Sequence, residues 1–438
     1  MRAALINPQG TIFSKNLRMK EFLEKTSSMS SFRHFWSAPC LGLLSVAAYI
    51  PDSWEVCYID ENYKTLDFSE KYDIVFISAM TVQAIRAYEI SDIFRSRGIL
   101  TVIGGIHATI LPEEAAKHAD SVIAGEGEKL FPLLISDYLK GRMKKIYQDE
   151  NSGSFRMNDC ITPRYELLKD YNYPIINIYT TRGCPRKCSF CCASNVFGTK
   201  YRRKPNEMIL SEIDYIKTMY PDKLILFADD NLFAYKNSTY GLLNDLCSKN
   251  IRWIAQTDIS ISNDGEILDL MYKSGCQWIV IGFESISEES LKNIEEINFK
   301  HKYVSGYSDA IKKIQSHGIK IYGTFIVGLD GDDTSVFERT ADFIINNDLY
   351  GANVTVPTPL PGTVLRKEME KNNRILSFDW SDYTLWDVII KPNKMSVREL
   401  EDGLLYTYQR ISSSANADDR LRSIHRAIKE KRISEKHE

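Results

Sequence analysis

Long apolar runs, internal repeats and low-complexity tracts are all absent from this sequence. No uninterrupted apolar stretch approaches the roughly 20 residues of a membrane-spanning helix. The first residues also lack the basic stretch and apolar core of a signal peptide. A formal net charge of only −3 offers no general attraction to nucleic acid or anionic lipid. We therefore expect a globular, cytoplasmic protein with no membrane span and no nucleic-acid partner.

Cysteine is also sparse, with nine residues in a chain of 438. So few cysteines in a chain of this length do not make a disulfide framework. Five of them are scattered singly, at Cys40, Cys57, Cys160, Cys247 and Cys276. The cysteine pattern thus indicates a reducing compartment.

The chain length allows two or three domains, and 44% hydrophobic with 26% charged residues is ordinary for a globular protein.

The other cysteines fall in one short loop. Cys184, Cys188 and Cys191 have the spacing C-x3-C-x2-C, and Cys192 follows directly. Three thiolates can hold three irons of a [4Fe–4S] cluster and leave the fourth iron open to another ligand. A structural zinc site usually has two Cys/His pairs, and buried structural thiols are the other alternative. No second pair lies near this loop in the sequence, and the side chain of Cys192 diverges from its neighbour, so we expect three iron ligands without Cys192.

The run Thr181–Cys191, TRGCPRKCSFC, resembles the signature of the radical S-adenosylmethionine (AdoMet) enzymes, including the aromatic Phe190 before the last cysteine. The resemblance implies that the three cysteines hold a [4Fe–4S] cluster and that AdoMet binds the open iron. An electron from the cluster then splits the sulfonium to give a 5′-deoxyadenosyl radical. It also implies a small-molecule substrate and a reductant such as flavodoxin or ferredoxin.

Residues 1–140 alternate short apolar segments with amphipathic ones. The expected strands are Ala3–Ile6, Glu55–Ile59, Ile74–Ser78, Leu100–Ile103 and Ser121–Ala124, and the expected helices are Leu41–Tyr49, Ala84–Arg95 and Lys129–Leu139. Parallel strands need crossover helices, so this order predicts an α/β domain with a doubly wound, flavodoxin-like parallel sheet. Ligands bind such a sheet at the carboxyl ends of its strands. Residues 141–172 are expected to form a polar linker.

A second, longer alternation begins near residue 173. Its six expected strands are Ile175–Tyr179, Leu224–Phe227, Trp253–Gln256, Trp278–Phe283, Ile321–Val327 and Asn353–Val356. Ile209, Ile213 and Ile216 predict a helix that begins after Pro205. Six such units with the cysteine loop after the first strand resemble the partial (β/α)6 barrel of radical AdoMet enzymes, here residues 173–365. Residues 366–438 are expected to form a mostly helical segment with a solvated charged tail, Lys429–Glu438.

Polar residues follow two of the expected barrel strands. Asp229 and Asp230 stand where many radical AdoMet enzymes carry a Gly-Gly-Glu that receives the AdoMet ammonium, and a carboxylate can do the same work. The alternative is a helix N-cap. Glu284 and Ser285 end the fourth strand, where family members contact the AdoMet ribose or carboxylate, although Ser285 can instead cap the next helix.

A basic run, Arg202–Lys204, lies beyond the last cysteine. We expect it to be solvated surface, with the AdoMet carboxylate, an anionic substrate or an electron donor as alternative partners. No further residue is assigned a catalytic role.

The first domain resembles the cobalamin-binding domain that precedes the barrel in one radical AdoMet subgroup. Ser78 ends the third strand and Gly104-Gly105 the fourth, where cobalamin domains carry the small residues beside which the nucleotide tail threads. The loop Asn7–Thr11 lacks the histidine of those domains, so bound cobalamin is expected to be base-off without a protein imidazole. His34 and His107 are the only nearby candidate ligands, and a lone histidine is more often packed or exposed. The alternative is a domain that keeps this fold without the cofactor.

The two resemblances together are typical of the subgroup that includes methylases of hopanoid lipids and bacteriochlorophylls. They imply hydrogen abstraction from an unactivated carbon and delivery of a methyl group from methylcobalamin, which a second AdoMet remethylates. Radical cyclisation, C–C coupling or rearrangement without catalytic cobalamin is the first alternative, and a non-catalytic corrinoid or Fe–S carrier is a remote one. A methylthiotransferase is disfavoured, because that group has three more cluster cysteines near the N-terminus and only Cys40 and Cys57 precede Cys160.

Overall fold

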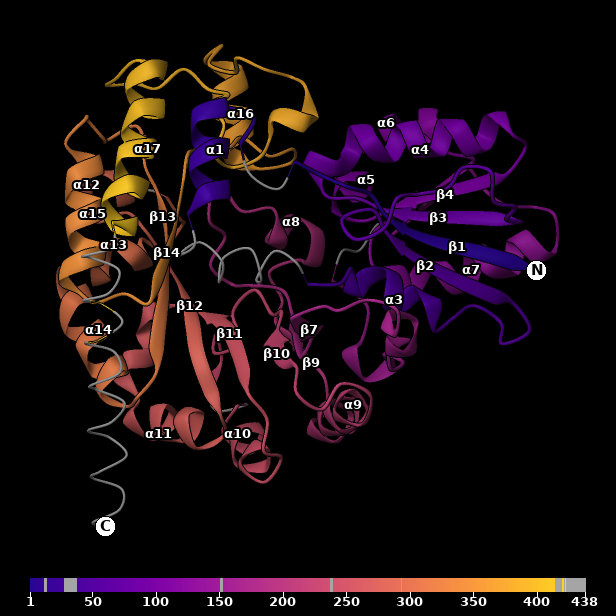
Figure 1. Ribbon diagram of the computed structural model, residues 1–438, viewed down its shortest axis with the longest axis horizontal. Coiled ribbons are helices and arrows are strands. Elements are labelled where there is room, and N and C mark those ends of the chain that lie inside the picture. The colour runs from indigo at the N-terminus through magenta and orange to yellow at the C-terminus, as the bar shows by residue number, and fades with distance from the viewer. Residues whose placement is uncertain are drawn as a thin grey trace.

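A computed structural model describes residues 1–11, 14–26, 38–149, 153–236, 239–292, 294–413, 420 and 422. These residues form two six-stranded parallel sheets, one in each half of the chain, and a small two-stranded antiparallel sheet (Figure 1). No helix among them is long and apolar enough to cross a membrane. His34 and the tail Lys429–Glu438 lie outside the described residues.

The N-terminal sheet has the strand order β2-β1-β3-β4-β5-β6, and all its pairs are parallel. The first five positions follow the flavodoxin-like order, which confirms the predicted doubly wound sheet. Its strands are β1 (Arg2–Asn7), β2 (Glu55–Asp60), β3 (Ile74–Ser78), β4 (Leu100–Gly104), β5 (Ser121–Ala124) and β6 (Ile146–Gln148). The short strand β6 was not predicted, and it lies in the stretch expected to be a linker.

Both faces of this sheet are covered, because alternate residues of each strand point to opposite sides. Ala3 and Leu5 pack with α3 (Leu41–Ala47) and α7 (Gly127–Leu139), whereas Ala4 and Ile6 pack with α4 (Ala84–Ser96). These three helices match the predicted ones. Three helices that the sequence did not predict are α1 (Leu17–Lys25), α5 (Ile106–Ile110) and α6 (Pro112–His118).

The second sheet has the order β14-β13-β12-β11-β10-β7, again with parallel pairs only. All six predicted barrel strands are present. They are β7 (Ile175–Ile178), β10 (Leu224–Phe227), β11 (Trp253–Thr257), β12 (Cys276–Glu284), β13 (Lys320–Ile326) and β14 (Gly351–Thr355). The first and last of these strands, β7 and β14, stand at opposite ends of the sheet, so the barrel is partial.

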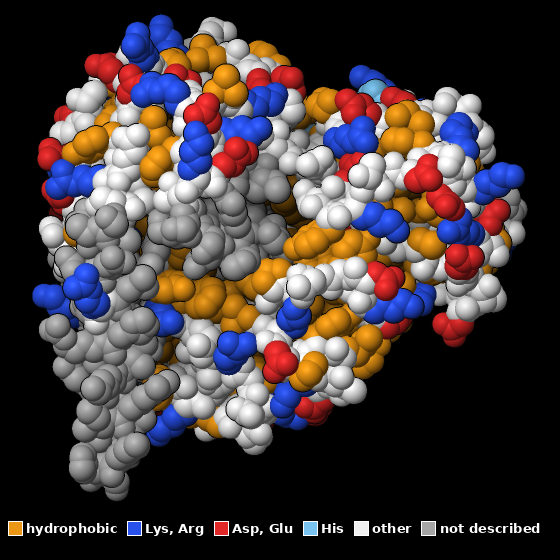
Figure 2. All heavy atoms as spheres, in the orientation of Figure 1, with side chains coloured by type: hydrophobic (Ala, Val, Ile, Leu, Met, Phe, Trp, Pro, Cys, Tyr) orange, Lys and Arg blue, Asp and Glu red, His pale blue; other side chains and the backbone are white. Residues whose placement is uncertain are grey.

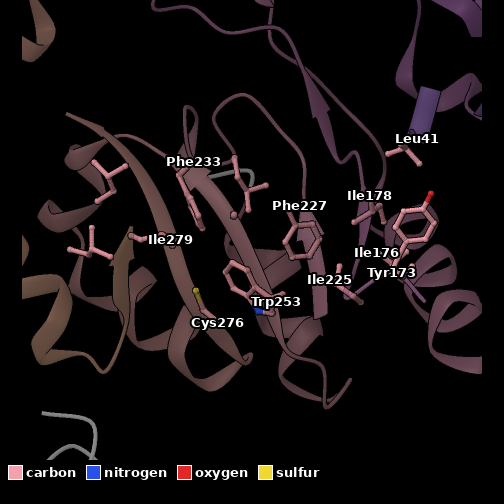
Figure 3. Close-up of a cluster of buried hydrophobic side chains, with 14 of the residues drawn as sticks. Leu41, Tyr173, Ile176, Ile178, Ile225, Phe227, Phe233, Trp253, Cys276 and Ile279 are labelled. Atoms are coloured by element: carbon pink, nitrogen blue, oxygen red, sulfur yellow. The ribbon is translucent and has the colours of Figure 1, made fainter. Parts of the chain in front are cut away.

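Helices cover the outer face of this sheet. The helices are α9 (Asn206–Met219), α10 (Tyr240–Cys247), α11 (Gly265–Lys273), α14 (Tyr307–Ser316) and α15 (Val336–Asn346). Isoleucines and aromatic residues fill the space between them and the strands, and Figure 3 shows part of this core around Trp253 and Phe227. Their rings meet edge to face at a centroid distance of 5.3 Å, and the Trp253 indole N–H donates to Ser274 O at 2.9 Å. The buried strands therefore hold their carboxyl ends in fixed register.

The C-terminal segment joins the two halves. Helix α16 (Val364–Lys371) and helix α17 (Val397–Ser412) confirm its predicted helical character. Helix α17 lies beside α1 (Figure 1), where Arg18 pairs with Asp402 at 2.5 Å. Between α16 and α17, the Trp380 indole N–H donates to Glu114 of α6 at 2.7 Å. Figure 2 shows Lys, Arg, Asp and Glu interspersed on this face of the molecule, without a large patch of one sign.

Candidate functional site

The cysteine loop leaves the carboxyl end of β7 through a short hairpin. Strand β8 (Thr181–Arg182) pairs with β9 (Arg202–Arg203), and Gly183 follows with a φ of +88°. A Cβ at Gly183 would lie 2.4 Å from the carbonyl oxygen of Lys200, so only glycine fits there. Ser189 is held on both sides, because its N–H donates to Ile294 O and its carbonyl accepts from Leu365 N–H, each at 2.9 Å. The cysteine loop is therefore fixed by the barrel and by α16.

The three cysteines form one electrostatically coupled group. Burial raises the pKa of all three thiols, that of Cys188 to about 12. Charge on Cys184 also raises the pKa of Cys188, and charge on Cys188 raises the pKa of Cys191. Neighbouring thiols with raised pKa values need a cation to become thiolates together, and cluster irons provide it. Among the described residues, no group of three His, Cys, Asp or Glu converges tightly enough for a single metal ion. Three thiols in one loop are the donor set that a [4Fe–4S] cluster takes, with one cysteine for each of three irons.

Asp229 is enclosed by the start of the cysteine loop. It is fully buried, and it accepts hydrogen bonds from the N–H and hydroxyl groups of both Thr180 and Thr181, at 3.0 and 3.1 Å for Thr180 and 2.6 Å for the Thr181 hydroxyl. Burial raises the pKa of Asp229 to about 6, although these hydrogen bonds lower it. Both carboxylate oxygens are thus engaged in holding the turn between β7 and β8.

Asp230 points the other way. Its side chain is exposed, and no described residue donates a hydrogen bond to it. Surrounding protein and the charge of Asp229 raise its pKa to about 6, while Arg182 lowers it. Its charge raises the pKa values of Cys184 and Cys191, so Asp230 faces the cysteine loop. Of the two adjacent aspartates, Asp230 is the one that can receive a ligand cation.

Asn231 belongs to a network that the sequence did not reveal. Its side-chain amide donates to Asp258 Oδ2 at 2.8 Å, and Arg186 Nη2 donates to the same oxygen at 2.7 Å. The Arg186 guanidinium also lies 3.6 Å from the centre of the Phe299 ring. Burial raises the pKa of Asp258, but Arg186 together with the hydrogen bonds from Ser260 and Asn231 outweighs burial, and the net shift is downward. Asp258 directly follows β11 and Asp229 lies two residues past the end of β10, so both lie near the carboxyl ends of barrel strands. That location was the available signal for Asp258.

Glu284 has a buried partner. Its φ is +63°, at a register shift between β12 and β13, and its Oε1 accepts from Lys300 Nζ at 2.9 Å. Burial lowers the pKa of Lys300, but Glu284 together with Cys188 and Tyr307 outweighs burial, and the net shift is upward. The Lys300 charge in turn lowers the pKa of Cys188 against its burial, so this pair lies beside the cysteine loop.

Ser285 does not cap the next helix, which was the alternative that the sequence left open. Its hydroxyl accepts from the Ser287 N–H at 3.1 Å, and Ser287 is the residue that caps α12 (Glu288–Leu291). Ser285 therefore forms the turn that leads into this helix.

The predicted small residues of the N-terminal domain lie at the carboxyl edge of its sheet, and the two glycines differ. Gly105 has a φ of +94°, and a Cβ there would lie 2.8 Å from Ala79 N, Ala79 O and Ser78 Oγ. A Cβ on Gly104 would make only ordinary contacts, at 3.7 Å from Ile123. Gly105 is thus required by its neighbours within the chain, whereas Gly104 leaves room for a Cβ.

The loop Asn7–Thr11 is held from within the domain. Gln83 Nε2 donates to Pro8 O at 2.7 Å and to Asn7 Oδ1 at 3.3 Å. His107 is buried, and its ring nitrogens lie 3.1 Å from the Tyr88 hydroxyl and 3.4 Å from the Thr81 hydroxyl. Burial lowers the pKa of His107 despite the nearby Glu114. His107 is therefore a packed histidine, as the sequence favoured.

The basic run Arg202–Lys204 is not solvated, so that prediction was wrong. Arg202 Nη1 donates to Glu126 Oε2 at 2.8 Å, and Lys204 Nζ donates to Glu212 Oε2 at 2.6 Å. Both pairs are buried. The reason is that β9 pairs with β8, which places Arg202 opposite Glu126, 76 residues away, while Lys204 reaches Glu212 of the following helix α9.

Comparisons with known proteins point to two domains. The model of the Radical SAM superfamily matches residues 178–344, and that of the B12 binding domain matches residues 37–135. The chain is 31% identical over 380 residues to the bacteriochlorophyllide d C-12(1)-methyltransferase of Chlorobaculum tepidum, covering 83% of this chain and 80% of the relative. It is 28% identical over 391 residues to the C-8(2)-methyltransferase of the same organism, covering 85% and 83%.

The fold also resembles a solved structure. The radical S-adenosylmethionine methyltransferase TsrM from Kitasatospora setae, with tryptophan substrate and a SAM analogue bound, superposes with a TM-score of 0.64. The match covers 85% of this chain and 76% of TsrM at 16% sequence identity, and at this identity it shows a shared fold.

Proposed function

Because this chain belongs to the radical AdoMet methyltransferases that carry a B12-binding domain, we propose that it methylates an unactivated carbon of a tetrapyrrole-like small molecule. Its cofactors are a [4Fe–4S] cluster, AdoMet and cobalamin. The supporting observation is that α5, which follows Gly104-Gly105, contacts α8 (Ala193–Phe197), which follows the cysteine loop. The edge that would hold cobalamin and the loop that would hold the cluster are therefore neighbours.

The residues of this chain divide the work of binding. When bound, the cluster supplies the electron that cleaves AdoMet, and cobalamin carries the methyl group. Cys184, Cys188 and Cys191 would hold the cluster, and Asp230 would accept hydrogen bonds from the AdoMet ammonium. Arg186, fixed by Asp258, shapes the cysteine loop between its first two cysteines.

The remaining residues that the sequence predicted at the two cofactor sites are assigned roles that take their observed contacts into account. Glu284 would accept from the AdoMet ribose hydroxyls in an orientation set by Lys300. Ser285 would support this segment through its turn. Ser78 and Gly104-Gly105 would line the path of the cobalamin nucleotide tail.

A tetrapyrrole-like substrate is favoured because both relatives above are named for bacteriochlorophyllide d. The test is an anaerobic assay of reconstituted protein with AdoMet labelled in its methyl group, a reductant and a panel of a chlorophyllide, a hopanoid and tryptophan. We expect labelled methyl in the chlorophyllide together with 5′-deoxyadenosine. Labelled hopanoid or tryptophan would reassign the substrate class. Deoxyadenosine with an unmethylated, rearranged product would favour the radical cyclisation or rearrangement alternative.

The two adjacent aspartates should respond differently to alanine. Asp230→Ala should raise the AdoMet dissociation constant about ten- to a hundredfold, because a charge-assisted hydrogen bond of about 1.5–3 kcal/mol is lost. Asp229→Ala should instead lower the free energy of unfolding by about 2–5 kcal/mol, because the buried N–H groups of Thr180 and Thr181 lose their acceptor. Equilibrium dialysis with AdoMet and thermal unfolding measure the two effects. An unchanged dissociation constant for Asp230→Ala would remove this residue from the AdoMet site.

Bound cobalamin should be base-off without a protein imidazole. The loop Asn7–Thr11 has no histidine, and His107 is packed against Tyr88 and Thr81. Electron paramagnetic resonance of the Co(II) form should show no splitting by an axial nitrogen, and His107→Ala should leave the spectrum unchanged. Nitrogen splitting that disappears in His107→Ala or His34→Ala would contradict the prediction.

A further inference from the structure

A buried cluster of four charged side chains joins the two halves of the chain. Arg182 Nη1 donates to Glu126 Oε1 and to Glu128 Oε2, both at 3.0 Å, and its Nη2 donates to Glu128 Oε1 at 2.5 Å. Arg202 Nη1 donates to both oxygens of Glu126, at 2.9 and 2.8 Å. Side-chain exposure is 8% or less for all four residues. We call Glu126, Glu128, Arg182 and Arg202 the arginine–glutamate cluster.

The arginine–glutamate cluster lies between the two proposed cofactor sites. Its arginines come from the hairpin β8–β9, and Arg182 precedes Cys184 by only two residues. Its glutamates come from the segment after β5, where Glu126 occupies the N-cap position of α7 and Glu128 lies in its first turn. That helix end favours negative charge, and it begins at the carboxyl edge of the sheet that also carries Ser78 and Gly104.

Simple adhesion between two domains does not need buried charges. Apolar side chains of similar size usually stabilise a packed interface as well as buried ion pairs do, because removing charges from water is costly. A guanidinium bound to two carboxylates does fix the relative orientation of the segments that carry these groups, because its planar, forked set of N–H donors accepts carboxylates only from a narrow range of directions. Arg182 meets Glu128 through two nitrogens and shares one of them with Glu126, so its guanidinium is held in both position and rotation.

Other ties between the halves do not involve the hairpin β8–β9. Two of them are buried, since the Tyr173 hydroxyl donates to Asp60 Oδ2 at 2.5 Å and Asn177 Nδ2 donates to Pro39 O at 3.1 Å, but they start from β7 and the segment before it.

Two other ties between the halves are nearer the surface. Trp380 contacts Glu114 at 2.7 Å, and Lys15 contacts Asp382 at 2.5 Å. Their partners are about a quarter to a half exposed, in contrast to the arginine–glutamate cluster. The arginine–glutamate cluster is therefore the tie best placed to orient the cysteine loop itself.

We propose that Arg182 is a positioning residue, and that the arginine–glutamate cluster sets the spatial relation between the cysteine loop and the cobalamin-binding edge. This inference rests on the proposed function, because it assigns the cluster and cobalamin to those two sites. Loss of the Arg182 guanidinium would leave each cofactor bound in its own half of the chain. The relative placement of the two halves would then vary.

The experiment compares wild type with Arg182→Lys and Arg182→Met. The matched control is Arg410→Gln, which removes an arginine that binds two carboxylates, Glu338 and Asp342, within the C-terminal half and near solvent. Pulsed electron paramagnetic resonance between the reduced iron cluster and Co(II) in the loaded protein reports the distribution of distances between the two sites. Hydrogen exchange of protein prepared without cobalamin reports local opening at β8 and the first turn of α7.

We expect a narrow distance distribution for wild type and Arg410→Gln, and a broad one for Arg182→Met, with unchanged iron and cobalamin contents. Exchange at β8 and the start of α7 should be at least about tenfold faster in Arg182→Met, because local opening becomes easier. Arg182→Lys should broaden the distribution too, since an ammonium keeps the charge without the fork. A charge exchange, Arg182→Glu with Glu128→Arg, should restore part of the protection.

An unchanged distance distribution and unchanged exchange in both Arg182 variants would overturn the proposal. If Arg182→Met does not fold, Arg182→Lys and Glu128→Gln decide by the same two measurements. Wild-type protein that retains no cobalamin would count against the proposed function, and the exchange measurement would still decide whether the arginine–glutamate cluster holds the cysteine loop.

Discussion

Alanine in place of Cys184, Cys188 or Cys191 should remove the [4Fe–4S] cluster and reduce AdoMet cleavage to background. Each of the three thiols would ligate a separate iron, so two remaining cysteines cannot hold the cluster in its place. Their mutual effects on pKa show that they form one group, and no other described cysteine is part of it except the adjacent Cys192. Iron and sulfide analysis after anaerobic reconstitution measures the cluster, and chromatography of 5′-deoxyadenosine measures cleavage.

Cys192→Ala is the matched variant for this prediction. Cys192 is the N-cap residue of α8, and its thiol is half-buried like the other three. We expect this variant to keep both cluster and AdoMet cleavage, because the spacing C-x3-C-x2-C is complete without it. Loss of the cluster in Cys192→Ala together with its retention in Cys191→Ala would reverse the ligand assignment. Cys247→Ala, at an exposed and distant position, controls for general loss of a thiol.

The sheets could be predicted because their strands are short apolar runs bounded by turns. Ala3–Ile6 and Ile74–Ile77 are buried on both faces, and such runs separated by helical patterns have few arrangements other than a parallel sheet. Strand β6 escaped prediction because it has only three residues, one of them exposed. Its pairing with β5 depends on a neighbour that only the folded sheet provides.

The partners of the site residues could not be predicted from local sequence. Asp229 and Asp230 are adjacent, and only the backbone direction after β10 decides which one turns inward. Lys300 reaches Glu284 from 16 residues away, and Arg202 reaches Glu126 from 76 residues away. The cysteine spacing could be interpreted without any structure because its chemistry lies within one loop, whereas these ion pairs depend on how distant strands are placed.

Valine at Gly105 and valine at Gly104 should both lower cobalamin retention, but for different reasons. At Gly105 a β-branched residue must adopt a φ of +94° and overlap Ala79 and Ser78, whose atoms would lie 2.8 Å from its Cβ. Strained backbone and overpacking together should lower the free energy of unfolding by about 2–5 kcal/mol. At Gly104 the nearest atoms would lie 3.7 Å away, so Gly104→Val should fold with nearly unchanged stability.

Thermal unfolding and cobalamin stoichiometry, measured on the same samples, separate the two effects. Gly104→Val should lose cobalamin while the melting temperature stays close to that of wild type, because its side chain would fill the path of the nucleotide tail without disturbing the sheet. Gly104→Ala is the smaller step at the same position and should retain most of the cofactor. Full cobalamin retention in Gly104→Val would mean that the tail does not pass beside β4. A stable Gly105→Val protein would show that the segment Ser78–Ala79 can move aside, and the close approach seen at Gly105 would then not be required for the fold.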